Sequence, residues 1–116
     1  TSDPYCVVLV SGTEVGRTST RTKTLNPIWG DPDSSFRFTT THAARVRVVI
    51  KDWDITSDDD PMGEVSFVIG DVEKDRRGKK TYNPNMWLNV VPTDDSPSDG
   101  KLQVAVMFED ALAPKH

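Results

Sequence analysis

Short runs of β-branched and aromatic residues, separated by turn-forming residues, constrain the fold of this chain more than any other feature. Apolar and polar residues alternate most clearly over 45–50 and 101–108, a period that gives a strand one buried and one exposed face. Helical periodicity is absent, apart from one helical or irregular excursion expected over Gly70 to Tyr82. We therefore predict an all-β antiparallel sandwich with strands at Tyr5–Val10, Phe36–Phe38, Val46–Ile50, Val65–Ile69, Trp87–Val91 and Leu102–Phe108.

Length and charge exclude several classes of protein. The chain has 116 residues, which suits one domain, and its formal net charge of −4 argues against a nucleic-acid-binding protein. The longest apolar run, Tyr5–Val10, is far shorter than the ~20 residues of a membrane-spanning helix. The lone Cys6 lies within that run, where we expect a buried thiol, and this is weakly consistent with a reducing compartment.

The most informative segment, 48–63, is a strand that leads into a loop with five carboxylates. Asp52 and Asp54 project to the same side of an extended chain, and Asp60 can return to the same point if the loop folds back. Crowded carboxylates repel each other unless a cation lies between them. The nearby donors are all oxygens, which favours Ca²⁺ over zinc, and the alternative is a solvated acidic loop.

Two other motifs at this segment fail. An EF-hand loop beginning at Asp52 has Ser57 at its sixth position and Gly63 at its twelfth, where glycine and glutamate are required. Asp52 to Thr56 also matches the Asp-x-Asp-x-Thr signature of haloacid-dehalogenase-like phosphatases, but that fold needs a parallel α/β sheet with helical crossovers. The histidines, His42 and His116, have no evident nucleophile partner, so we expect no catalytic activity.

Three motifs in order resemble the C2 domain of protein kinase C and synaptotagmin: Ser2-Asp3-Pro4-Tyr5-Cys6, Thr24-Leu25-Asn26-Pro27-Ile28-Trp29, and Asp52-Trp53-Asp54 followed by Asp60 and Met62-Gly63. The resemblance extends to the Phe36-x-Phe38 segment, to Trp87-Leu88 and to the closing 100–106 segment. It implies an eight-stranded antiparallel Greek-key β-sandwich whose apical loops bind two or three Ca²⁺ ions. Through these ions, such domains attach to anionic phospholipids.

The resemblance also implies the residues of the calcium site. Asp3 matches an aspartate of the first loop, and the third loop contributes three further aspartates, a backbone carbonyl at Trp53 and an additional oxygen ligand at Ser57. The metal residues implied are Asp3, Asp52, Trp53, Asp54, Ser57 and Asp60.

Membrane contacts are implied at two places. Ile55 and Thr56 fall at the loop tip that enters the bilayer interface. Arg17 matches one of the lysines that bind phosphoinositide in the family, whereas Val7 and Ser19 replace others, so phosphoinositide selectivity is not implied. A basic strand surface that includes Arg17, Arg21 and Lys23 can still contact anionic lipid, and an ordinary solvated face is the alternative.

The family's first aspartate of loop one, and the strand before it, would lie before Thr1. That strand is central to one sheet, and its absence would expose backbone groups and core surface. We therefore expect residues 1–116 to form a single C2-like domain that is incomplete at its N-terminus, with the central strand supplied by an upstream segment or another molecule.

The sequence thus predicts a non-catalytic, calcium-regulated module of signalling or membrane trafficking. We expect it to be cytoplasmic and to associate peripherally with anionic membranes when Ca²⁺ binds. Its partners would be the phospholipid surface and protein partners or domains of its parent protein, with no nucleic acid. The alternative function is a calcium-independent protein-interaction scaffold that uses a sheet face or the basic patch at Lys74–Lys80.

Overall fold

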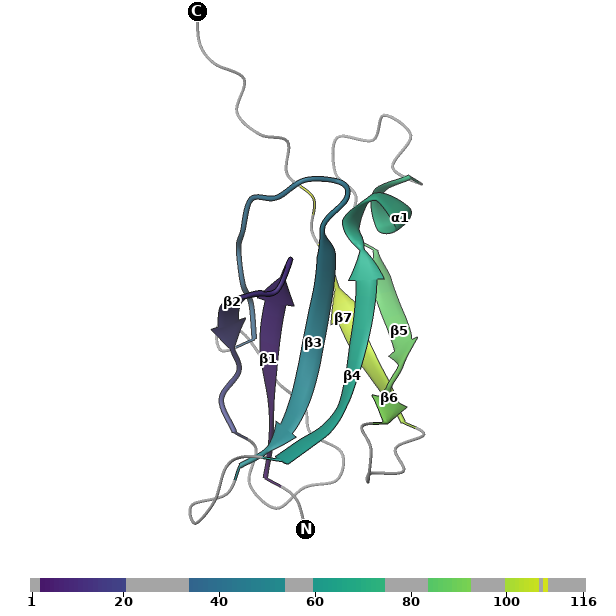
Figure 1. Cartoon of the computed structure of the whole chain (residues 1–116). Helices are drawn as coiled ribbons and strands as arrows, with labels where there is room; N and C mark the ends of the chain where they lie inside the picture. The colour runs from purple at the N-terminus through teal and green to yellow at the C-terminus, as the bar shows by residue number, and fades with distance from the viewer. Residues whose placement is uncertain are drawn as a thin grey trace, which may run out of the picture.

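The computed structural model (Figure 1) describes residues 3–20, 34–53, 60–74, 84–92, 100–106 and 108. In these residues every paired strand runs antiparallel to its neighbour, which confirms the predicted all-β antiparallel fold. In chain order the elements are β1 (Pro4–Val10), β2 (Thr13–Arg17), β3 (Arg45–Asp52), β4 (Asp60–Val68), α1 (Ile69–Glu73), β5 (Asn85–Asn89), β6 (Val91–Pro92) and β7 (Lys101–Ala105).

The strands form two layers. One sheet has the order β2-β1-β3-β4-β6, and the other pairs β5 with β7. In the view of Figure 1, β7 passes behind β4, and β5 lies to the right of β4. Because a sheet that covers another must bury one face, the apolar side chains of both layers meet between them. The buried core consists of Cys6, Val8, Val10, Ala44, Val46, Val48, Val65, Ile69 and Val90.

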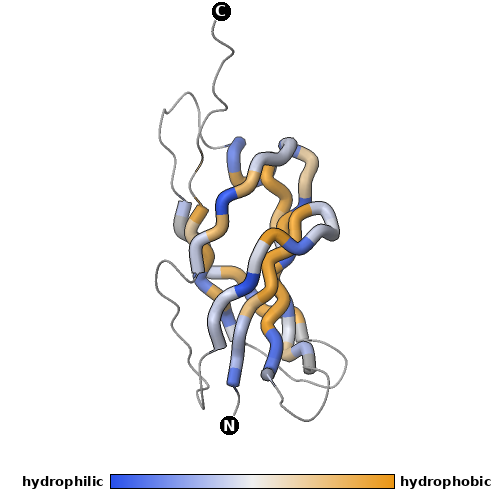
Figure 2. The backbone as a smooth tube through the Cα atoms, turned by 90° about the vertical axis from the view of Figure 1, so that its left-hand side faces the viewer, coloured by the Kyte–Doolittle hydropathy of each residue, from blue (hydrophilic) through white to orange (hydrophobic). Residues whose placement is uncertain are grey.

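β1 and β3 show two patterns of burial. Six of the seven residues of β1 are buried, so both faces of this strand, which lies between β2 and β3, are covered. In β3, buried Val46 and Val48 alternate with the more exposed Arg45 and Arg47, as the sequence predicted. Figure 2 shows the resulting hydrophobic colour along the strands and hydrophilic colour toward their ends.

The prediction of a strand at Phe36–Phe38 is wrong. Residues 35–40 form no strand in the structure, although Phe36 and Phe38 pack against the core. The Phe36 ring lies so close to Gly16 of β2 that a Cβ atom at that position would overlap it. The apolar run therefore indicated burial correctly, but aromatic side chains can bury area from an extended segment without ladder hydrogen bonds.

The described residues form seven strands, and three of these, β2, β5 and β6, differ from the predictions. Two predicted strands also end too late: Ile69 begins α1 instead of ending β4, and β7 ends at Ala105 instead of Phe108. β2 was missed because its residues are exposed apart from Gly16, which gives a weak apolar signal. The predicted strand Trp87–Val91 is split at Val90, which is buried in the core, into β5 of one sheet and β6 of the other. The expected strand from outside this sequence stays a prediction.

α1 overlaps the expected excursion of Gly70 to Tyr82, of which residues 75–82 lie outside the described residues. Its first residue, Ile69, is buried and donates a backbone hydrogen bond to the Ala44 carbonyl at 3.0 Å. His42 Nδ1 lies 2.7 Å from Glu73 Oε2, which ties the other end of the helix to the same turn. Within the described part of the chain, no helix has the length and apolar character needed to cross a membrane.

Candidate functional site

Strand register brings three acidic residues to one end of the larger sheet. Asp52 is the last residue of β3, and its cross-strand partners are Pro4 on β1 and Asp60 on β4. Asp3 immediately precedes Pro4 in the chain. Asp52 therefore lies between two other acidic positions that are 49 residues before it and eight residues after it in the chain.

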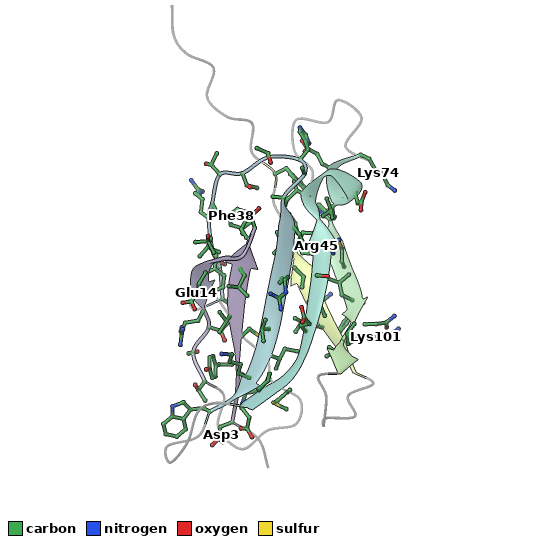
Figure 3. The ribbon with its side chains drawn as sticks, in the orientation of Figure 1. Asp3, Glu14, Phe38, Arg45, Lys74 and Lys101 are labelled. Carbon is green, nitrogen blue, oxygen red and sulfur yellow. The ribbon has the colours of Figure 1, made fainter. Side chains whose placement is uncertain are left out.

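Two hydrogen bonds join Asp3 to the end of β3. The backbone N–H of Asp3 donates to Oδ1 of Asp52 at 2.8 Å, and the backbone N–H of Trp53 donates to the Asp3 carbonyl at 2.9 Å. Figure 3 shows Asp3 at the end of the molecule opposite Lys74. The first acidic position predicted from the sequence is thus held directly against the second.

A bulge in β4 determines which residue lies opposite Asp52. The register shifts between Ile50 and Lys51, since Ile50 pairs with Gly63 and Lys51 pairs with Pro61, so that Met62 is the extra residue. Without this bulge, Pro61 would lie opposite Asp52. A β-bulge re-aims the residues that follow it, and here it places the backbone of Asp60 opposite Asp52.

The groups at this end that could bind a metal ion, among the described residues, are carboxylate and carbonyl oxygens. This ligand type suits a hard cation such as Ca²⁺. Asp54 and Ser57 lie outside the described residues, as do Ile55 and Thr56. Among the residues that the structure describes, no group of three or more His, Cys, Asp or Glu side chains is arranged to hold a metal ion.

The Trp53 side chain is a feature of this end that sequence reasoning missed. Trp53 is 46% exposed, whereas the sequence assigned a role only to its backbone carbonyl. An apolar aromatic residue between two aspartates was the available signal. Tryptophan combines a large apolar ring with a polar N–H, which suits the boundary between water and lipid headgroups.

Arg17, predicted to contact lipid, is engaged within the protein. Its guanidinium forms two hydrogen bonds with the Glu14 carboxylate, at 2.9 and 3.3 Å, and lies 5.9 Å from the centroid of the Tyr5 ring. The register between β1 and β2 shifts after Val8, which leaves Val15 as an extra residue and brings Glu14 and Arg17 to the same side. Arg21 and Lys23 lie outside the described residues.

A second ion pair lies on β3 and β4. Arg47 donates two hydrogen bonds to the Glu64 carboxylate at 2.8 and 3.1 Å. This hydrogen bonding, more than the charge of the guanidinium alone, lowers the pKa of Glu64 below its ordinary value. Arg45, near the other end of β3, donates to the hydroxyl of Ser66 at 3.2 Å.

A protein-family model described as C2 domain matches residues 1–84. Among similar curated proteins, Ras GTPase-activating protein 4 of Mus musculus is 40% identical over 128 aligned positions, which cover 98% of this chain and 15% of that protein. Tricalbin-3 of Saccharomyces cerevisiae is 31% identical over 89 residues, which cover 77% of this chain and 5% of that protein. The chain therefore spans a small part of the curated relatives that it matches.

Two solved structures are similar in fold. A C2 domain of plant extended synaptotagmin 1 aligns with a TM-score of 0.66 and 18% identity, over 96% of this chain and 81% of that one. A structure described as that of a C2 domain aligns with a TM-score of 0.61 and 19% identity, over 93% of this chain and 81% of that one. At these identities the likeness shows the fold.

Proposed function

The chain belongs to the C2 domain family, and from that premise we propose that it is a calcium-regulated membrane-targeting module. In this proposal the aspartates at one end of the larger sheet bind Ca²⁺, and the loaded site binds anionic phospholipid. The module has no catalytic activity of its own. It is cytoplasmic and associates with the membrane surface when Ca²⁺ rises.

The observation that carries the proposal is the position of Asp52. It accepts a hydrogen bond from Asp3, the residue before β1, and lies opposite Asp60, the first residue of β4. Acidic residues gathered from the residue before β1, from β3 and from β4 repel one another, and this repulsion costs free energy unless a cation offsets it. Asp3, Asp52 and Asp60 would hold the cation, together with the Trp53 carbonyl, Asp54 and Ser57. Bound Ca²⁺ would supply positive charge and open coordination positions for phosphate or carboxylate oxygens of lipid headgroups.

The net charge of the chain supports coupling between the binding of Ca²⁺ and the binding of anionic lipid. The chain has a formal charge of −4, so anionic lipid is repelled while the site is empty. Two Ca²⁺ ions would offset this charge and reverse the local potential. Because lipid oxygens complete the coordination that the protein leaves open, each ligand should raise the affinity for the other.

Apolar and basic side chains would strengthen the attachment. The exposed Trp53 is at the acidic end, and Ile55 and Thr56 follow it closely in the chain, so these residues would meet the bilayer interface. Arg17, Arg21 and Lys23 would provide a second contact with anionic headgroups. Since Glu14 already pairs with Arg17, we assign Arg17 the weaker part of that contact.

The test is co-sedimentation of the protein with phosphatidylserine vesicles, in Ca²⁺ and in chelator. We expect binding in Ca²⁺ alone and loss of binding in the double variant Asp52→Asn/Asp54→Asn. The matched control is Asp71→Asn/Asp75→Asn, which removes the same number of charges in the α1 region and should bind as the wild type does.

Two results would overturn the proposal. Folded protein that stays in the supernatant under both conditions would exclude calcium-dependent lipid binding and favour the protein-interaction scaffold. Equal sedimentation in Ca²⁺ and chelator would instead point to the basic residues as the sole lipid contact.

A further inference from the structure

The hydrogen bonds at Asp3 depart from those of a regular antiparallel ladder. Trp53 N–H donates to the Asp3 carbonyl, which makes Asp3 and Trp53 the next hydrogen-bonded pair beyond Pro4 and Asp52. Such a pair normally exchanges two bonds, so the Asp3 N–H would donate to the Trp53 carbonyl. Here it donates to Oδ1 of Asp52 at 2.8 Å instead.

This substitution changes the partners of the Trp53 carbonyl. Within the described residues the Trp53 carbonyl oxygen accepts no hydrogen bond, because its ladder donor is taken by the Asp52 side chain. A carbonyl oxygen with open lone pairs is a cation ligand that a regular ladder would not provide.

The bonds of Asp3 lie beside a position, Pro4, at which β1 directs no backbone hydrogen bond to β3. Backbone groups of a strand point alternately to its two neighbours, and those of Cys6 bond Thr18 on the β2 side. Pro4, two residues earlier, therefore faces away from β3, and it has no N–H to donate in any case. The two bonds of Asp3 thus hold the chain before Tyr5 against the end of β3.

We propose that Asp52 is a positioning residue as well as a cation ligand: by accepting the Asp3 N–H, it fixes Asp3 beside the site and leaves the Trp53 carbonyl open to a cation. This inference rests on the proposed function for the identity of the cation. The hydrogen bond itself exists without any cation, so it can be tested separately.

Two substitutions separate the roles of Asp52. Asp52→Asn keeps an oxygen that can accept the Asp3 N–H but loses the charge, whereas Asp52→Ala loses both. The same two substitutions at Asp60, the cross-strand partner of Asp52, are the matched control, since they leave the acceptor at Asp52 in place.

The first measurement is made in chelator on ¹⁵N-labelled protein. We expect the Asp3 amide to be protected from hydrogen exchange in wild type and in Asp52→Asn, and to exchange about tenfold faster or more in Asp52→Ala. We also expect Asp52→Ala to lower the melting temperature by about 3–6 °C relative to Asp52→Asn, the effect of one lost hydrogen bond in a domain of this size. The two Asp60 variants should show equal protection at Asp3.

The second measurement is the carbonyl ¹³C shift of Trp53 during titration with Ca²⁺ alone. We expect a calcium-dependent shift in wild type, the same shift at higher Ca²⁺ in Asp52→Asn, and its loss in Asp52→Ala. The inference is overturned if the Asp3 amide is unprotected in wild type, or if Asp52→Asn and Asp52→Ala agree in both measurements. Protection at Asp3 without any calcium-dependent shift in wild type would confirm the hydrogen bond and overturn both the carbonyl's role and the proposed calcium site.

Discussion

The hydroxyl of Thr18 accepts a hydrogen bond from the backbone N–H of Cys6 at 2.9 Å, and the Thr18 N–H donates to the Cys6 carbonyl at 2.8 Å. Among the described residues, Thr18 is the one buried polar residue, with 9% of its surface exposed. Its side chain thus occupies a place that a main-chain carbonyl would fill in a regular ladder. The pairing of β1 continues by this means beyond the last residue of β2.

Replacing Thr18 by Val should therefore destabilise the protein. The Cys6 N–H would lose its acceptor in a buried position, at a cost of about 1–3 kcal/mol in the free energy of unfolding. Thr18→Ser keeps the hydroxyl and is the control, with a smaller loss from the missing methyl group. Urea unfolding monitored by circular dichroism measures both variants, and equal stability of Thr18→Val and wild type would contradict this role.

The Cys6 thiol should be unreactive in the folded protein. It is 3% exposed, and burial raises its pKa to about 12 from an ordinary 9.0. Labelling by an aromatic disulfide reagent should therefore proceed through opening of β1, and urea should accelerate it. Rapid labelling of one thiol per molecule in the native protein would exclude this placement of Cys6.

The same raised pKa has a consequence in alkali. The folded state keeps the Cys6 proton longer than the unfolded state does, so this stabilisation is complete below pH 9.0 and is lost as the pH rises toward about 12. Cys6→Val should remove this part of the alkaline loss of stability. Unfolding free energies of the two proteins at increasing pH make the comparison.

The Arg47–Glu64 pair should contribute stability in the opposite pH direction. Because the pKa of Glu64 is lowered, its contribution is complete above the ordinary value of 4.5 and is lost as the pH falls below it. The side chains are 42% and 30% exposed, so solvent screening limits the effect to about 0–1 kcal/mol. Glu64→Gln should be less stable than wild type near neutral pH and equal to it in acid, and a difference that grows in acid would contradict the assignment.

Gly63 should resist substitution. A Cβ atom there would overlap Cγ1 of Val90 and lie 3.1 Å from the Val91 carbonyl oxygen. Val90 and Val91 come this close because the chain passes from β5 of one sheet to β6 of the other beside Gly63. Gly63→Ala should cost about 1–3 kcal/mol through overpacking. In Gly63→Ala/Val90→Ala the cost should be less than the sum of the single costs, as measured by a double-mutant cycle, whereas strict additivity would indicate no contact.

The sequence predicted the strands whose apolar residues face the core, since alternation and β-branching directly reflect burial. Through the C2 resemblance it predicted that Asp3 and Asp52 lie together, and the hydrogen bond between them agrees with that placement. It missed the Glu14–Arg17 pair because residues three apart on a regular strand lie on opposite faces, and only the extra residue Val15 brings them together.

The sequence offered a signal for Trp53, an aromatic residue between two aspartates, but no signal for the hydrogen bond from Asp3 to Asp52. That hydrogen bond depends on how two segments 49 residues apart meet at a sheet end, and no local pattern encodes that geometry. For the Phe36–Phe38 segment, the apolar pattern correctly predicted burial against the core but wrongly predicted a hydrogen-bonded strand.

Calcium titration with and without phosphatidylserine vesicles shows whether the acidic end of the sheet couples Ca²⁺ to anionic lipid. Calorimetry in the absence of vesicles, and tryptophan fluorescence in their presence, give the two apparent affinities. We expect phosphatidylserine to raise the apparent calcium affinity by about tenfold or more, phosphatidylcholine vesicles not to do so, and Asp52→Asn/Asp54→Asn to abolish the effect. Calcium affinity that is identical with both lipids, or an undiminished effect in the double variant, would contradict this coupling.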